Sequence, residues 1–164
     1  MNSSTFLESW DRQAQIMESL CGLISDELKL AKPSDDGMPL FEQIAHVHQC
    51  RKGWLSVASP EHSAQLENVY VPQGDTWVPI DDFAKIKEQF RLSSAAVREA
   101  TQSALEQNIA PMGPYDHPVF FLQHMLWHEG YHAGLILLAL RLAGQDPGDA
   151  WEEKHIWELW RGPE

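Results

Sequence analysis

Three histidines at four-residue spacing are the residues of this sequence best suited to chemistry. They are His124, His128 and His132, in the segment FFLQHMLWHEGYHAGLILLALRLAG. Residues four apart lie on one face of an α-helix, so the three rings fall within about 80° of one another. Close imidazolium charges repel, whereas neutral imidazoles bind a shared divalent cation well. The spacing therefore indicates a metal site, like those of other helices that bind zinc.

The three rings are expected to face the protein interior. On a helical wheel they share their sector with apolar side chains such as Phe121, Leu135 and Ala139, and an apolar stripe faces the core. A single histidine there would be explained by a hydrogen bond to a backbone carbonyl. Three stacked imidazoles favour a shared cation instead, with ordinary hydrogen-bonded core histidines as the alternative.

A metal site also needs a ligand from another part of the chain, and the segment FEQIAHVHQCRKGW offers candidates. His46 and His48 flank the apolar face of this predicted helix at similar offsets, so the helical wheel does not choose between them. Cys50 lies one turn beyond His46 and is either a softer ligand or a small buried thiol. The nearby acids Glu42 and Glu129 are expected on the surface.

Helical periodicity and helix breakers predict five helical segments. The first is broken by Pro33, Gly37 and Pro39, which disfavour helix. Residues 59–80 combine β-formers with prolines and are expected to be loop with a short extended piece. Long helices with little strand signal favour an all-α bundle whose sites lie between facing helices. The predicted helices span about 5–30, 40–58, 81–107 and 116–144, with a short last helix within 145–160.

Composition narrows the class of protein. The chain has 164 residues, of which 43% are hydrophobic, and a net charge of −12, which suits one folded domain and disfavours nucleic acid as a partner. The segments CRKGW and KIKEQFR hold only two or three bases each and predict no basic face, and the scattered acids indicate a solvated surface. No apolar run reaches the ~18 residues of a membrane span. Two cysteines and no secretory signal predict reduced thiols in the cytoplasm.

Taken together, the histidine patterns resemble those of the DinB-like superfamily, bacterial four-helix bundles that include bacillithiol- and mycothiol-dependent transferases. The segment HVHQCRKGW matches a histidine followed eight residues later by tryptophan, and HMLWHEGYHAG matches the histidine pair with its following glycine. The continuation LILLALRLAGQDP and the tryptophan-rich tail also fit. The resemblance implies an all-α, up-down-down-up four-helix bundle with a short C-terminal helix, as a single domain over residues 1–164.

Carried over position by position, the resemblance implies that His46, His128 and His132 bind a metal ion. Three imidazole ligands favour zinc, with nickel next. His124 matches a further family histidine that lines the cavity, and His48 matches no family position. The family often reads His-His-Arg-Gly-Gln where this chain has YHAGL. The substrate class therefore does not carry over with the ligands.

Three histidines leave coordination positions open for reaction. A metal-bound thiol or water ionises far below its free pKa, so the resemblance implies a metal-dependent thiol S-transferase, or a related hydrolase, acting on a small-molecule thiol and an electrophile. The alternative is a non-catalytic stress-response or binding module with a structural or vacant metal site. A homodimer through bundle faces is expected, as in many relatives. The sequence assigns no catalytic residue beyond the ligands, and no role to Cys50.

Overall fold

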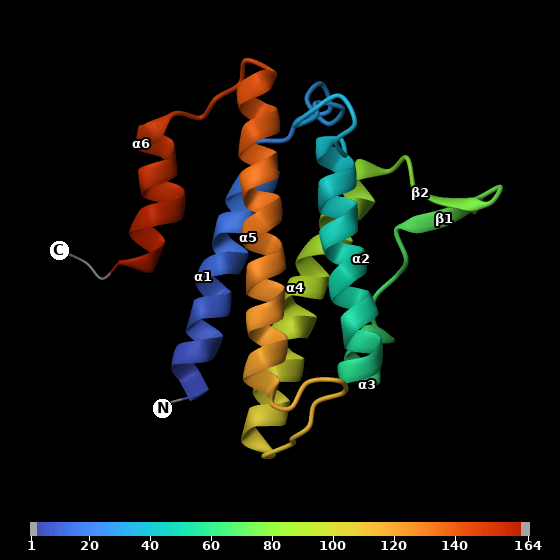
Figure 1. Cartoon of the computed structure of the whole chain (residues 1–164), viewed down its shortest axis with the longest axis vertical. Helices are drawn as coiled ribbons and strands as arrows, with labels where there is room; N and C mark the ends of the chain where they lie inside the picture. Colours follow the sequence, from blue (N-terminus) through green and yellow to red (C-terminus); the bar gives the residue numbers. More distant parts are fainter. Residues whose placement is uncertain (1–2, 162–164) are drawn as a thin grey trace.

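The computed structural model describes residues 3–161 and shows four long helices packed side by side (Figure 1). Helices α1 and α5 run in one direction and α2 and α4 in the other, giving the up-down-down-up order (Figure 1). The predicted all-α bundle is therefore confirmed, while residues 1–2 and 162–164 of the predicted domain lie outside the described residues. The long helices are α1 (Ser3–Gly22), α2 (Leu40–Ala58), α4 (Phe83–Glu106) and α5 (Pro118–Leu142).

Shorter elements fill the connections. Helix α3 (Pro60–Ser63) follows α2, and a two-stranded antiparallel hairpin, β1 (Tyr70–Gln73) and β2 (Thr76–Pro79), precedes α4. The predicted C-terminal helix is α6 (Asp149–Glu152), which continues as a π-helical turn and a 3₁₀ turn to Trp160. None of the described helices combines the length and hydrophobicity that crossing a membrane requires.

Local signals place the ends of α4 and α5 as the sequence predicts. Asp82 caps α4, because its carboxylate accepts a hydrogen bond from the Lys85 backbone N–H at 2.9 Å. His117 caps α5 in the same way, with its Nδ1 accepting from the Val119 N–H at 3.2 Å. Beyond the end of α5, Gly144 adopts a positive φ of 73°, the left-handed conformation in which helices commonly end.

The first helix is shorter than predicted. It ends at Gly22 rather than near residue 30, since glycine in the last turn weakens a helix. The chain then bends, which buries the Ile24 side chain in the core with 1% exposure. The bend is tied to the start of α2, where the Leu40 N–H donates to the Ala31 carbonyl at 2.9 Å. Packing and tertiary hydrogen bonds therefore override the helical pattern that continues past Gly22.

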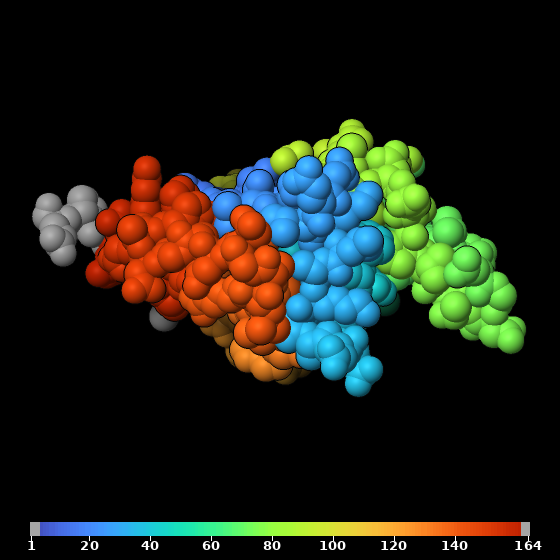
Figure 2. Space-filling view, turned by 90° about the horizontal axis from the view of Figure 1, so that it is seen from above, coloured from blue at the N-terminus to red at the C-terminus, as the bar shows by residue number. Residues whose placement is uncertain are grey.

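The hairpin is the part of residues 59–80 that the sequence describes least well. Gly74 supplies the positive φ of 61° at its turn, and Figure 2 shows the hairpin, in green, extending beyond the bundle. Both strands of a two-stranded ribbon are edge strands, so Pro72 and Pro79 remove no essential ladder bond. The predicted short extended piece is therefore a complete hairpin.

The core consists of two clusters of buried side chains. Among the tryptophans only Trp10 is fully buried in the described chain, whereas Trp77, Trp127 and Trp157 are more than half exposed. Most of the tryptophans therefore lie at least partly on the surface of the described chain rather than in its core. The first cluster includes Ile16, Met17, Leu20, Ile44, Val47, Phe90, Ile136 and Leu140, and the second includes Trp10, Leu55, Val97, Ala100, Phe121 and Met125.

Candidate metal centre

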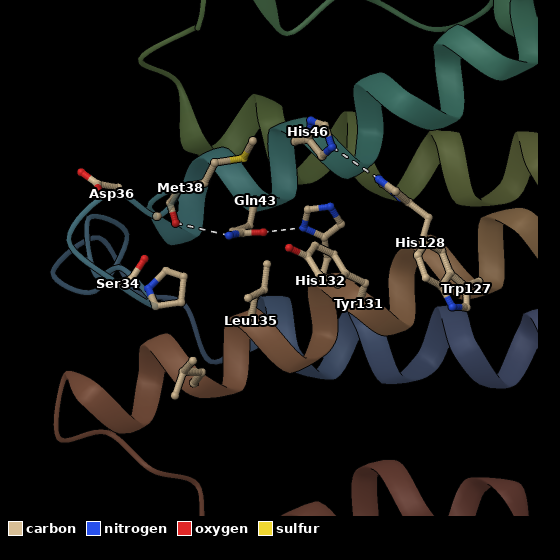
Figure 3. A pocket seen from close by; sticks show the side chains of 13 residues that line it. Ser34, Asp36, Met38, Gln43, His46, Trp127, His128, Tyr131, His132 and Leu135 are labelled. Carbon is tan, nitrogen blue, oxygen red and sulfur yellow. Dashed lines mark hydrogen bonds between the residues drawn. The ribbon is translucent and has the colours of Figure 1, made fainter.

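Helices α2 and α5 bring three imidazoles together. One nitrogen from each of His46, His128 and His132 lies within 4.8 Å of the other two, and Figure 3 shows the three rings gathered between the helices. His46 Nε2 and His128 Nε2 are 3.4 Å apart. These are the three residues that the family resemblance implies, and no other group of three metal-binding side chains occurs within residues 3–161. We call them the histidine trio.

The geometry of the trio fits a divalent cation. With metal–nitrogen bonds of about 2.0–2.1 Å, two ligands at a tetrahedral angle lie about 3.4 Å apart. The two Nε2 atoms of His46 and His128 are separated by 3.4 Å. The ring centroid of His132 lies 4.9 Å from that of His46 and 4.6 Å from that of His128. The three rings are therefore spaced for one ion with coordination positions left over.

Gln43 fixes the orientation of one ring. Its side-chain oxygen accepts a hydrogen bond from His132 Nδ1 (Figure 3), which leaves His132 Nε2 with a free lone pair. The Gln43 amide also donates to the Met38 carbonyl at 3.3 Å. Such partners orient metal-binding histidines and raise their basicity. Sequence reasoning missed Gln43, although a glutamine on an apolar face one turn before His46 was a signal of it.

Replacing Gln43 by leucine is expected to weaken metal affinity by about 10–100-fold, because His132 loses the partner that holds its ring. Competition with a chromophoric chelator measures the change. Gln43→Glu keeps an oxygen acceptor and is expected to stay close to the native affinity. Equal affinity for Gln43→Leu and native protein would show that Gln43 only packs.

Burial keeps the trio neutral. It lowers the pKa of His46 below its ordinary value, with Glu42 opposing the shift. Burial, followed by the neighbouring His46, His124 and Arg51, lowers the pKa of His128 to about 4. Burial and the two other members of the trio lower the pKa of His132 to about 3. Neutral imidazole is the form that binds metal, so little proton release is needed at neutral pH.

The metal-free protein is therefore expected to lose stability as the pH falls below about 6.5. In that range the unfolded histidines bind protons that the folded trio does not, so the free energy of unfolding decreases with falling pH. Urea denaturation of chelator-treated protein between pH 7.5 and 4.5 measures this decrease. His128→Leu removes one depressed histidine and is expected to make the decline shallower. An unchanged slope in that variant would contradict the assignment.

The structure distinguishes His46 from His48, between which the helical wheel did not choose a candidate metal ligand. His46 belongs to the trio, whereas His48 is fully buried on another side of α2, with Nε2 2.9 Å from the Glu67 carbonyl oxygen. His48 thus fastens the segment before the hairpin to α2. Cys50 is half-buried, with Sγ 3.4 Å from His46 Nε2, and burial raises its pKa. It adjoins the trio without belonging to it.

His124 lies one turn away from the trio and serves another contact. Its Nδ1 is 2.7 Å from the Tyr115 hydroxyl, and the edge of the Trp54 ring packs on it at a centroid distance of 5.2 Å. His124 is not among the described residues that line the cavity beside the trio. The tyrosine and tryptophan draw its ring toward the start of α5.

A buried ion pair joins His132 on the inner face of α5. Glu129 is fully buried and accepts a hydrogen bond from Arg51 Nε at 2.7 Å. Arg51 Nη1 also donates to the Phe90 carbonyl at 2.7 Å, and its guanidinium lies 4.4 Å from the Phe90 ring and 5.5 Å from the Trp10 ring. Burial raises the pKa of Glu129, which Arg51 opposes. The expectation that Glu129 lies on the surface is therefore wrong.

A cavity of about 650 Å³ opens beside the trio. We call it the main cavity. Figure 3 shows Trp127, Tyr131 and Leu135 on its α5 side, and residues of the connection between α1 and α2 opposite them. Trp127 belongs to its lining, whereas Trp54 does not. The lining consists of Pro33, Ser34, Asp36, Gly37, Met38, Gln43, His46, Trp127, His128, Tyr131, His132, Leu135 and Leu138.

A comparison with protein families adds to this geometry. The model described as the DinB family matches residues 1–158, nearly the whole chain. The chain belongs to the DinB family. This membership confirms the resemblance inferred from the histidine patterns. Comparisons with curated proteins and with solved structures found no match.

Within this DinB fold, the trio could hold a divalent metal ion. The two ligand helices enter the site from opposite directions, since α2 and α5 are antiparallel (Figure 1). His128 and His132 come from successive turns of α5, and His46 comes from the middle of α2. Each ligand thus lies on a long packed helix rather than on a loop, which suits a site with fixed geometry.

Proposed function

We propose that this DinB-family protein is a metal-dependent enzyme that transfers an electrophile onto a low-molecular-weight thiol. The observation that carries the proposal is the convergence of His46, His128 and His132 within 4.8 Å at the wall of the main cavity. The three imidazoles would hold zinc or nickel, both of which accept nitrogen ligands. When bound there, the cation would lower the pKa of a coordinated thiol, so that the sulfur would be a thiolate and reactive at neutral pH.

The residues of the chain would bind and orient the reactants. The Gln43 side-chain oxygen holds the His132 ring by accepting a hydrogen bond from the His132 Nδ1–H. Trp127 and Tyr131, which are 74% and 57% exposed, present aromatic surface to an apolar electrophile. Their partial exposure leaves the main cavity open to solvent, so both substrate entry and product release are direct.

The reaction is a nucleophilic substitution. The thiol loses its proton to solvent, the sulfur forms a bond to the electrophilic carbon, and the bond from that carbon to the leaving group breaks with both electrons going to the leaving group. No oxidant or reductant is needed. With a chloroaromatic compound as the electrophile, the products are a thioether, chloride and a proton.

Two measurements test the proposal. Elemental analysis of protein purified without a histidine tag is expected to give close to one zinc or nickel per chain. Conjugation of small thiols to a reactive chloroaromatic, followed by absorbance, is expected to require that metal. A protein that takes up no metal after reconstitution would be a non-catalytic module, and a protein that binds metal but forms no thioether would refute the transferase.

The predicted homodimer and the predicted cytoplasmic location stay predictions. Sedimentation of the native protein tests the first. Exposed aromatic side chains on the outer surface, such as Trp157 and Trp160 at 54% and 42% exposure, would suit an interface between bundle faces.

A further inference from the structure

A second cavity lies on the hairpin side of α2. It has a volume of about 510 Å³ and shares Met38 and His46 with the main cavity. The imidazole of His46 is therefore accessible from two separate spaces. We call the second space the hairpin cavity. Its lining consists of Met38, Glu42, His46, Gln49, Cys50, Asn68, Tyr70 and Trp77.

Glu42 is the source of charge in the hairpin cavity. It is the only carboxylate among the described residues that line this space, and neither lysine nor arginine is among them. Burial, together with Glu42 and Cys50, raises the pKa of Tyr70, so the phenol is neutral at pH 7. Glu42 takes part in no ion pair within the described part of the chain. The hairpin cavity therefore presents a negative charge that no cationic side chain of its lining neutralises and that the first turn of α2 offsets only in part.

Aromatic rings accompany this carboxylate. Tyr70 stands at the base of β1 and Trp77 lies in β2, so the hairpin contributes both rings to the cavity. Trp77 is 62% exposed, which leaves much of its indole free to contact a ligand. A carboxylate beside tyrosine and tryptophan rings is a combination that attracts ammonium groups, through charge-assisted hydrogen bonding and cation–π attraction.

The hairpin cavity disfavours anionic ligands, whereas in the main cavity a bound divalent ion would offset the charge of Asp36. Asp36 and Glu42 are the carboxylates of the two linings, and no described residue of either lining is a lysine or an arginine. The whole chain carries a net charge of −12. A thiol that carries several carboxylates would therefore meet repulsion both on approach and in the bound state.

We propose that the hairpin cavity binds the ammonium group of the thiol substrate, so that the substrate is an amine-bearing thiol. This inference rests on the transferase function proposed above. The ammonium group contacts Glu42 and the Trp77 ring, while the sulfur extends past the His46 ring toward the ion that the trio would hold. The main cavity, on the other side of His46, is then free for the electrophile. The His46 side chain would then lie between the thiol in the hairpin cavity and the electrophile in the main cavity.

Three thiols of similar size and different charge test the proposal. Isothermal titration calorimetry of the zinc-loaded protein is expected to show that cysteamine binds about tenfold more tightly than 2-mercaptoethanol, with 3-mercaptopropionate the weakest. Glu42→Gln is expected to remove the advantage of cysteamine. Asp36→Asn removes the same charge from the main cavity and is expected to keep the advantage. Trp77→Ala, on the exposed hairpin, is expected to reduce it.

The outcomes separate this inference from the function on which it rests. The inference fails, and the transferase function does not, if the affinity of the three thiols does not depend on their charge. The same holds if the preference for cysteamine persists in Glu42→Gln. The second result is the one expected if the amine of cysteamine only chelated zinc. If no thiol binds more tightly to zinc-loaded than to metal-free protein, both the inference and the transferase function fail.

A metal-free measurement gives an independent check. Phenethylamine and 2-phenylethanol differ in charge but not in shape, and neither needs the ion. Phenethylamine is expected to bind chelator-treated protein more tightly than 2-phenylethanol, and the difference is expected to disappear in Glu42→Gln. Equal binding of the two compounds to the native protein would contradict the assignment of the hairpin cavity.

Discussion

Protein carrying His128→Ala is expected to take up far less metal than the one ion per chain proposed for the native protein. His128 Nε2 lies 3.4 Å from His46 Nε2, so removal of its ring takes away one of the ligands of the trio. The loss in affinity should exceed the about 10–100-fold cost of removing a group that only orients a ligand. Elemental analysis and chelator competition measure it, and thioether formation should fall with the metal content.

A matched pair of variants on α2 tests the same assignment. His46→Ala is expected to abolish metal binding, whereas His48→Ala is expected to retain it. His48 makes its hydrogen bond to the Glu67 carbonyl, so its replacement should lower the free energy of unfolding instead. The reverse result, with metal lost in His48→Ala and kept in His46→Ala, would refute the site.

Replacing Arg51 by methionine is expected to destabilise the fold by about 3–5 kcal/mol, the usual cost of removing one partner of a buried ion pair. Arg51 and Glu129 are 1% and 0% exposed, so the remaining carboxylate would have neither a charge partner nor water. Urea denaturation at pH 7 measures the change. Lys52→Met alters the neighbouring residue, which forms no ion pair within residues 3–161, and is expected to stay within about 0.5 kcal/mol of native.

The stability deficit of Arg51→Met is expected to depend on pH. Burial raises the pKa of Glu129 above its ordinary value of 4.5, and loss of Arg51 would raise it further. A raised carboxyl pKa contributes stability at low pH that is lost as the pH increases, so the deficit should grow above about pH 4.5. The double variant Arg51→Met with Glu129→Leu is expected to recover most of the loss. A deficit that persists in the double variant would show that Arg51 acts through packing alone.

The sequence predicted the bundle because helix boundaries are local signals. Asp82 before α4 and Gly144 after α5 mark ends that hydrogen bonding and backbone geometry confirm. The grouping of His128 with His132 is also local, since both lie on one helix. The α1 boundary was wrong because the bend after Gly22 depends on a contact with the start of α2, which helical periodicity does not contain.

The parts that the sequence missed depend on contacts between distant segments. Arg51 and Glu129 are 78 positions apart, and arginine and glutamate are residue types that usually lie on the surface. Gln43 and His132 are 89 positions apart, so no spacing rule connects them. The choice between His46 and His48 required the packing of α2 against α5, since a helical wheel shows offsets but not which neighbour each side faces.

Because His46 and His128 lie 82 positions apart, metal binding would act as a removable cross-link between the two halves of the chain. An unfolded chain does not present these nitrogens together, so free metal is expected to raise the melting temperature through mass action. At a free metal concentration 100 times Kd, the stabilisation is about 2.7 kcal/mol. Metal supply would then control how much of the protein resists unfolding and proteolysis, apart from any catalytic turnover.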